Sequence, residues 1–407
     1  MDKRTAFDKA INATSLIFKS SPVNVLLVFL PFGLLGGYLG WNAIAVFVLN
    51  FFAICALASI LAFSTECISD HVGETLGALL NATFGNIVEL IVSVIALRNN
   101  QIRIVQTSML GSILSNLLLV LGCCFVCGGW NRLQQSFSKT VAQTMSSLMA
   151  LACASLVIPA AFNASLAELN HEAPATPENP NPEILALSRA TSVVLLVIYV
   201  LYLFFQLVTH RSLFEPAEHE LDDEHHSIRR GSILSSEESH LPEVPVSLDD
   251  DLYTLSLRSS IITLVVSTLL TSFSADFLVG SIDVMVERTG ISKSFIGLIL
   301  IPIIGNAAEH ITAVIVATKD KMDLAIGVAV GSSMQIALFV TPAMVLAGWA
   351  MDVPMNLYFS LIETAVLFVS VFITNYLILD GESNWLEGAM LLGTYIIIAL
   401  AFYFFPG

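Results

Sequence analysis

Two glutamates lie where carboxylates are rare, each near the middle of a long apolar run. Glu89 belongs to the sequence GNIVEL and Glu309 to the sequence GNAAEH. A charged side chain at the centre of a bilayer costs about 2.5–3.5 kcal/mol or more, so function is the default interpretation of both. Asn86 and Asn306 each precede one glutamate by three residues, so on a helix an amide oxygen and a carboxylate share one face.

Carboxylate, amide and backbone oxygens together make a site for a hard cation. Two carboxylates among six to eight oxygens suit Ca²⁺, and Mn²⁺ is also plausible. Cys124 and Cys127 have metal-site spacing, but no second pair accompanies them, so we interpret the cysteines as apolar filler. Other polar side chains either complete the walls or join helices. They are Ser108, Ser112 and Ser115 in one apolar run and Ser332 with Gln335 in another.

The paired carboxyl groups suggest a way to couple the cation to protons. Burial disfavours the charged form of a carboxyl group. Two glutamates with one divalent cation sum to zero charge, and so do two glutamates with two protons. The empty site would hold two unpaired negative charges in a low dielectric, which is costly. We therefore predict that only the loaded forms cross the membrane easily, which is the condition for exchange.

Four further ionisable residues fall within or beside apolar runs. Glu66 and Asp276 occupy matching sequences 210 residues apart, and they either relay protons and cations or are acids at helix ends. His310 follows Glu309 and either modulates its proton affinity or forms a hydrogen bond in the core. Glu363 is a candidate partner for a neighbouring helix, and the sequence leaves its role open.

Composition indicates the setting in which these residues work. Of the 407 residues, 56% are hydrophobic and only 12% are charged, about half the charged fraction of a soluble domain. This excludes a soluble enzyme, a disordered chain and a nucleic-acid-binding protein. We expect an all-α integral membrane protein whose main surroundings are the lipid bilayer, without a resident cofactor. The sequence does not indicate an oligomeric state.

Eleven apolar runs are each long enough to span a bilayer core of about 30 Å as a helix. Backbone groups have no water to pair with in lipid, so we expect these runs to be helical. The runs cover 22–40, 44–65, 75–97, 107–127, 142–162, 189–209, 258–280, 293–317, 324–346, 357–379 and 385–405.

The two halves of the chain resemble each other. Residues 77–97 align with 297–317 at an offset of 220, with eight of 21 positions identical and Gly-Asn-x-x-Glu in register. The offset equals five helices, an odd number, so we predict two inverted five-helix repeats plus an extra N-terminal helix. The expected parts are an N-terminal tail (1–21), the extra helix (22–40), a first repeat (44–209), an acidic linker (210–257) and a second repeat (258–405).

Basic residues orient the chain. With a cytosolic N-terminus, 12 of the 17 Lys and Arg residues fall in cytosolic segments, which predicts a C-terminus in a lumen or outside. The net charge is −16, and the stretch 210–251 holds 12 of the 33 acids. That stretch is either a solvated linker or a region that concentrates or senses cations before entry. For the second role we single out Glu218, Glu220, Asp222, Asp223 and Glu224.

The motifs GNIVEL and GNAAEH, with the flanking sequence SMLGSILSNLLLVLG, resemble the cation/proton exchanger family of the calcium/cation antiporter superfamily. The resemblance covers nearly the whole chain. It implies eleven helices with the first peripheral, and proton-driven Ca²⁺ transport from cytosol into an acidic vacuole. It also implies that Glu89 and Glu309 bind the ion with Asn86 and Asn306 nearby, and that Glu66 serves the cation and proton path.

Three other functions fit parts of the sequence. A gated cation channel would use the paired glutamates as a filter, although channels usually build filters from several subunits. A membrane calcium sensor would use only the acidic linker and leaves the buried glutamates unexplained. A sodium- or potassium-coupled calcium exchanger is the nearest rival, and the Gly-Asn-x-x-Glu pattern resembles the proton-coupled branch instead.

Overall fold

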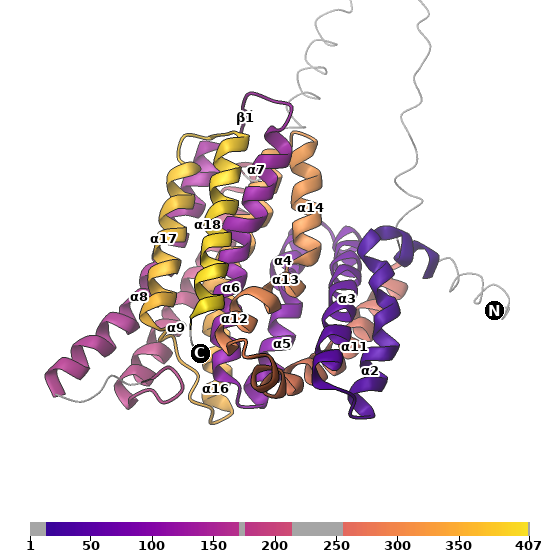
Figure 1. Ribbon diagram of the computed structural model, residues 1–407. Helices are drawn as coiled ribbons and strands as arrows, with labels where there is room; N and C mark the ends of the chain where they lie inside the picture. Colours follow the sequence, from indigo (N-terminus) through magenta and orange to yellow (C-terminus); the bar gives the residue numbers. More distant parts are fainter. Residues whose placement is uncertain (1–13, 171–175, 214–254, 406–407) are drawn as a thin grey trace, which may run out of the picture.

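The computed structural model describes residues 14–170, 176–213 and 255–405, and these form a bundle of long helices (Figure 1). Glu218, Glu220, Asp222, Asp223 and Glu224 lie outside the described residues. The first half contains η1 (Pro22–Val28), α2 (Phe29–Tyr38), α3 (Ala43–Val72), α4 (Glu74–Phe84), α5 (Ile87–Arg98), α6 (Ile102–Leu114), η2 (Ser115–Val120), α7 (Leu121–Gly129), β1 (Gln135–Ser136), α8 (Lys139–Asn170), α9 (Pro182–Phe204), η3 (Phe205–Thr209) and η4 (Arg211–Leu213).

The second half also consists of long and interrupted helices. It contains α11 (Leu257–Thr289), α12 (Lys293–Phe295), η6 (Ile296–Leu300), α13 (Ile301–Gly305), α14 (Ala307–Thr318), α15 (Met322–Gln335), η7 (Ile336–Val340), α16 (Thr341–Ala350), α17 (Leu361–Leu377), β2 (Glu382–Ser383) and α18 (Trp385–Phe404).

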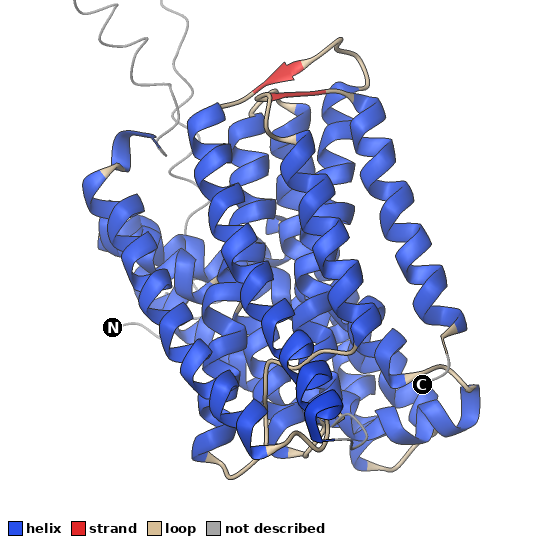
Figure 2. Ribbon diagram, turned by 90° about the vertical axis from the view of Figure 1, so that its left-hand side faces the viewer, coloured by secondary structure: helices blue, strands red, loops and turns tan. Residues whose placement is uncertain are grey.

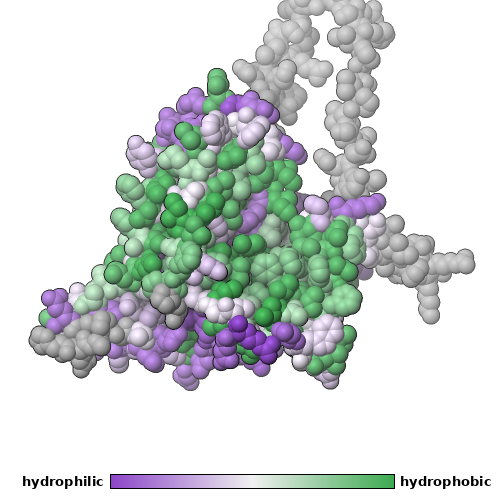
Figure 3. Space-filling model, viewed as in Figure 1, coloured by the Kyte–Doolittle hydropathy of each residue, from purple (hydrophilic) through white to green (hydrophobic). Residues whose placement is uncertain are grey.

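The surface identifies a multi-pass membrane protein. Seven described helices are long and apolar enough to cross a bilayer, and nine are if each of two bent pairs is one span. Large apolar side chains such as Val200, Ile262 and Ile397 are more than 60% exposed, as lipid-facing residues are. Figure 3 shows hydrophobic residues around the middle of the molecule and hydrophilic residues gathered at its two ends.

The two runs that carry the glutamates are broken, although we expected one helix over each. The first run divides into α4 and α5 at Gly85 and Asn86. The second divides at Asn306 between α13 and α14, where the axis bends by 59°. Gly and Asn have low helix propensity, which makes this shared dipeptide a weak point in both helices. Pro302, inside α13, weakens the second helix further.

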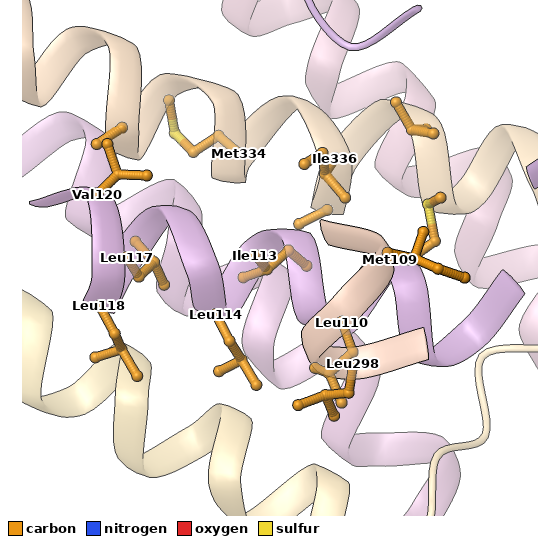
Figure 4. Packing of buried hydrophobic residues seen from close by; sticks show 14 of the residues in the cluster. Met109, Leu110, Ile113, Leu114, Leu117, Leu118, Val120, Leu298, Met334 and Ile336 are labelled. Atoms are coloured by element: carbon orange, nitrogen blue, oxygen red, sulfur yellow. The ribbon is translucent and has the colours of Figure 1, made fainter. Parts of the chain in front are cut away.

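Two groups of helices make up the bundle. In the smaller group, the long helices α3 and α11 pack against each other, with α2 beside both. The larger group consists of α6, α7 and α8 together with α14, α15, α16, α17 and α18 (Figures 1 and 2). At one end of the molecule β1 pairs antiparallel with β2, which joins the loop before α8 to the loop before α18. Figure 4 shows the core, where Leu110 and Ile113 of α6 pack near Leu298 of η6 and Met334 of α15.

Candidate functional site

The site forms where two half-helices begin. Asn86 is the residue before α5 and Asn306 the residue before α14, and each glutamate lies in the first turn of its helix. The N-terminus of a helix carries partial positive charge, which favours a carboxylate there. From this shared region α14 extends toward the end of the molecule that carries β1, and α5 toward the opposite end (Figure 1).

The two glutamates belong to one neighbourhood, because the Glu89 carboxylate packs against Gly305, which lies four residues before Glu309. Glu89 is buried, with 7% of its surface exposed, and Glu309 is half-buried. No basic side chain forms an ion pair with either glutamate among the described residues. Two like charges close together in a low dielectric are destabilising unless a cation or protons neutralise them.

Each asparagine contacts the opposite half of the chain. The Ser332 hydroxyl donates a hydrogen bond to Oδ1 of Asn86 at 2.9 Å. The Asn306 amide donates to the backbone carbonyl of Ser112 at 3.4 Å. The structure therefore brings Asn86, Asn306, Ser112 and Ser332, which the sequence predicts, into one cluster with the glutamates.

Asn116 is a member of this cluster that our sequence analysis missed. Its amide donates to Oε2 of Glu309 at 3.3 Å and to Oγ of Ser332 at 2.9 Å. A detectable signal exists, because Asn116 is a polar residue in an apolar run, one helical turn after Ser112. The residue at the matching position in the second half of the chain is Ile336. A search for polar residues that occur in both halves therefore does not find Asn116.

Several buried oxygens of the cluster lack a donor in the described part of the chain. They are both carboxylate oxygens of Glu89 and the amide oxygens of Asn116 and Asn306. Buried acceptors are nearly always satisfied, so this set indicates a missing ligand that supplies positive charge. Together with Glu309 these side chains offer the hard oxygens that Ca²⁺ prefers, and water or backbone groups would complete the shell.

A small cavity adjoins Glu89. Its polar lining consists of Glu89 on α5 with Ser108 and Ser112 on α6, and Gly305 of α13 also lines it. A methyl group at Gly305 would collide with the Glu89 carboxylate, so the absence of a side chain there makes room for the glutamate. The first glycine of the pair, Gly85, lies beside the Gln335 amide oxygen.

The ring of His310 lies near a serine and not in the group of cation-binding oxygens described above. Nε2 of His310 lies 3.2 Å from Oγ of Ser115 on η2, which fits the hydrogen-bonding alternative for this histidine. Within the described segments no three His, Cys, Asp or Glu side chains converge to hold a metal. A cation bound here would therefore take its other oxygens from amide, hydroxyl or backbone groups or from water.

Two predicted pathway residues lie outside the cluster. Glu66 is exposed near the C-terminal end of α3, one helical turn from Asp70. Asp276 is exposed on α11 and accepts a hydrogen bond from the Asn99 amide at 3.4 Å. In the described part of the chain no hydrogen bond or ion pair links either residue to Glu89 or Glu309, and their role on the path stays a prediction.

Glu363 has a partner of its own. It is fully buried at the start of α17 and forms an ion pair with Arg103 of α6 at 2.6 Å. Its second oxygen accepts from the Ser360 backbone, which completes a capping box. Glu363 is thus an interhelical partner, as one interpretation of the sequence had it.

Comparison with known proteins gives a consistent picture. The family model described as sodium/calcium exchanger protein matches residues 42–208 and 259–404. A vacuolar calcium ion transporter of Schizosaccharomyces pombe is 47% identical over 409 residues, covering 100% of this chain and 90% of that protein. A Ca²⁺/H⁺ antiporter of Aphanothece halophytica is 41% identical over 381 residues, covering 94% of this chain and 96% of that protein.

Solved structures also match the fold. The structure of native YfkE has a TM-score of 0.74 and 32% sequence identity, covering 94% of this chain and 100% of that one. The crystal structure of an H⁺/Ca²⁺ exchanger, CAX, has a TM-score of 0.64 at 12% identity, covering 96% of this chain and 93% of that one, and shows a likeness of fold.

Proposed function

Since the chain belongs to the sodium/calcium exchanger family, a family of transporters and not of enzymes, we propose that it is a secondary active antiporter that exchanges Ca²⁺ for protons. The names of its relatives support both substrates, because one is called a vacuolar calcium ion transporter and another a Ca²⁺/H⁺ antiporter. The observation that carries the proposal is the group of donor-less buried oxygens around two unpaired glutamates.

Glu89 and Glu309 are the groups that Ca²⁺ and protons share. Asn86, Asn306 and Asn116 supply or position amide oxygens, and the site is neutral with one Ca²⁺ or with two protons. The doubly ionised empty site is costly to enclose in a low dielectric. Reorientation therefore proceeds with cargo bound, and an uphill flux of Ca²⁺ is coupled to a downhill flux of protons.

Alternating access follows from an inverted repeat of two five-helix units, with α2 as the extra helix and eleven spans in total. The break before Glu89 and the break before Glu309 support this repeat, because they occur at the same sequence motif in half-helices that extend to opposite ends. Binding near the midplane at the interface of two repeats is the usual plan of such transporters. The polar side chains that line this path or stabilise its walls are Ser112, Ser332, Gln335 and His310.

We place the protein in the vacuolar membrane with a cytosolic N-terminus and a lumenal C-terminus. The location rests on the names of the relatives. The orientation rests on the basic residues, because it places 12 of the 17 Lys and Arg residues in cytosolic segments. Glu66, Asp276 and the acidic residues of the linker would then recruit cations and protons near the two membrane surfaces.

Uptake of ⁴⁵Ca²⁺ into acid-loaded proteoliposomes, with the voltage clamped by potassium and valinomycin, tests the proposal. We expect uptake that follows the pH gradient, acidifies the medium and is competed by Mn²⁺ but not by Na⁺. Uptake that was independent of the imposed pH gradient would indicate a channel. Uptake that needed Na⁺ inside, or that was lost when the assay was repeated without potassium and valinomycin, would indicate the other branch of the superfamily.

A further inference from the structure

The cavity beside Glu89 is too apolar to hold the cation itself. It lies between α5, α6 and α13, and Glu89, Ser108 and Ser112 are the lining residues with polar side chains. The rest of its wall is aliphatic, with Gly305 in addition. Ca²⁺ takes six to eight oxygen ligands, a number that these three side chains cannot reach.

The cavity fits one water molecule in size and in polar partners. It leaves about 10 Å³ for the centre of a water molecule, and a single buried water needs about 10–15 Å³ with two to four polar partners. Both Glu89 oxygens and the Ser112 hydroxyl have no hydrogen-bond partner in the described chain. The Ser108 hydroxyl donates to the Val105 carbonyl at 3.0 Å and still has lone pairs to accept with.

We propose that this cavity is a water site. One water molecule there donates hydrogen bonds to the Glu89 carboxylate and to the Ser108 hydroxyl, and it accepts a hydrogen bond from the Ser112 hydroxyl. All three side chains are more than nine-tenths buried, so this water would satisfy groups that bulk solvent does not reach. The same water is an aqua ligand of the cation that Glu89 binds, and this second part rests on the proposed function.

The chain itself supplies the variant that tests the site. The residue aligned with Ser108 in the second repeat is Val328, so the same fold holds valine at the matching helical position. Ser108→Val removes the hydroxyl and fills the cavity, whereas Ser108→Ala removes the hydroxyl and leaves the space. Ser93→Ala is the matched control, because Ser93 is equally buried on α5 but does not line the cavity.

Radiolytic hydroxyl-radical footprinting of the full chain in nanodiscs, followed by mass spectrometry, detects ordered water beside otherwise dry side chains. We expect oxidation of Val92 and Ile304 in the wild type, in Ser93→Ala and in Ser108→Ala, and its loss in Ser108→Val. Wild-type Val92 and Ile304 that stay unlabelled, or labelling that persists in a folded Ser108→Val, would overturn the water site. Monodisperse gel filtration and an unchanged melting temperature show that each variant is folded. If Ser108→Val does not fold, the wild type still decides the question, because Val92 and Ile304 that stay unlabelled there overturn the water site.

Equilibrium ⁴⁵Ca²⁺ binding to the same samples tests the second part. We expect Ser108→Val to weaken binding severalfold while Ser93→Ala leaves it unchanged. Ser108→Val that loses the water but keeps wild-type affinity would refute the aqua ligand. A wild type that shows the water but binds no Ca²⁺ would leave the water site standing and overturn the proposed function instead.

Discussion

The two halves of the site hold their glutamates differently. Glu309 accepts a hydrogen bond from Asn116, which also donates to Ser332, and Ser332 in turn holds Asn86. Glu89 is more deeply buried, and its carboxylate has no hydrogen-bond partner among the described residues. A duplicated pair of glutamates has therefore become one fixed carboxylate and one that rests beside a cavity.

The difference arises at neighbouring positions of the repeat and not at the glutamates. Asn116, which holds Glu309, is matched by Ile336, and Ser108, which lines the cavity at Glu89, is matched by Val328. No hydrogen bond to protein must break when Glu89 changes its rotamer, whereas Glu309 must leave Asn116. The comparison teaches that two glutamates in the same motif can have different surroundings, because residues outside the motif differ.

The largest effect should come from removing either negative charge. Glu89→Gln and Glu309→Gln each leave the site with one carboxylate, so a divalent cation is no longer neutralised. A loss of about 3 kcal/mol, the low end for breaking a buried charge pair, corresponds to a fall of more than about 100-fold in proton-driven ⁴⁵Ca²⁺ uptake. Glu287→Gln is the matched control, because it removes an exposed carboxylate on α11 to which we assign no role in transport, and it should retain the uptake. Full uptake by either site variant would sink the exchange mechanism.

Glu363, which is buried like Glu89, allows an effect on stability to be distinguished from an effect on transport. Glu363 is paired with Arg103, and removing one partner of a buried pair costs about 3–5 kcal/mol. Glu363→Gln should therefore lower the free energy of unfolding, measured by thermal denaturation in detergent. Glu89→Gln should keep or raise the melting temperature, because it removes a buried charge that nothing pairs with.

The paired variant supplies the control for this contrast. Arg103→Gln combined with Glu363→Gln removes both charges and should be more stable than either single variant. If Glu89→Gln destabilised the protein as much as Glu363→Gln, then Glu89 would have a structural partner and the contrast between the two halves would fail.

Sequence patterns marked the parts of this site that repeat most clearly, and they missed Asn116, which does not repeat. Glu89, Glu309 and the asparagines before them are marked by the recurrence of Gly-Asn-x-x-Glu in apolar surroundings. Asn116 has no counterpart, and its contact with Glu309 depends on how helices distant in sequence pack. The membrane class and most helical runs follow from hydropathy alone, because lipid forces backbone groups to pair within a helix.

The breaks in two helices show a second limit. Pro302 marks the interruption of the second run, but nothing as strong as proline marks the first, where Gly85 and Asn86 alone divide α4 from α5. Gly and Asn lower helix propensity by at most about 1 kcal/mol each, which does not by itself break a helix in lipid. The break is decided by tertiary contacts such as the one from Ser332 to Asn86, and these cannot be read from local sequence.

An intermediate effect should follow from loosening Glu309. Asn116→Leu keeps a side chain of similar size and removes the donor to the carboxylate. A hydrogen bond to a charged group is worth about 1.5–3 kcal/mol, so the KM for Ca²⁺ should rise about tenfold or more. Ile336→Leu, at the matching position, should have little effect on KM. Equal effects of the two substitutions would show that packing and not the hydrogen bond matters at Asn116.

The smallest effect compares the two matching serines directly. Ser332 joins Asn86 to Asn116 through its hydroxyl, whereas the Ser112 hydroxyl has no protein partner in the described segments. Ser332→Ala should raise the KM for Ca²⁺ about fivefold, the equivalent of about 1 kcal/mol for a neutral hydrogen bond. Ser112→Ala should change it less, because any loss there is limited to contacts with water or with the cation. Parallel ⁴⁵Ca²⁺ uptake curves measure both KM values. A larger effect of Ser112→Ala would contradict the comparison, because the more important hydroxyl would then lie beside Glu89 and not beside Glu309.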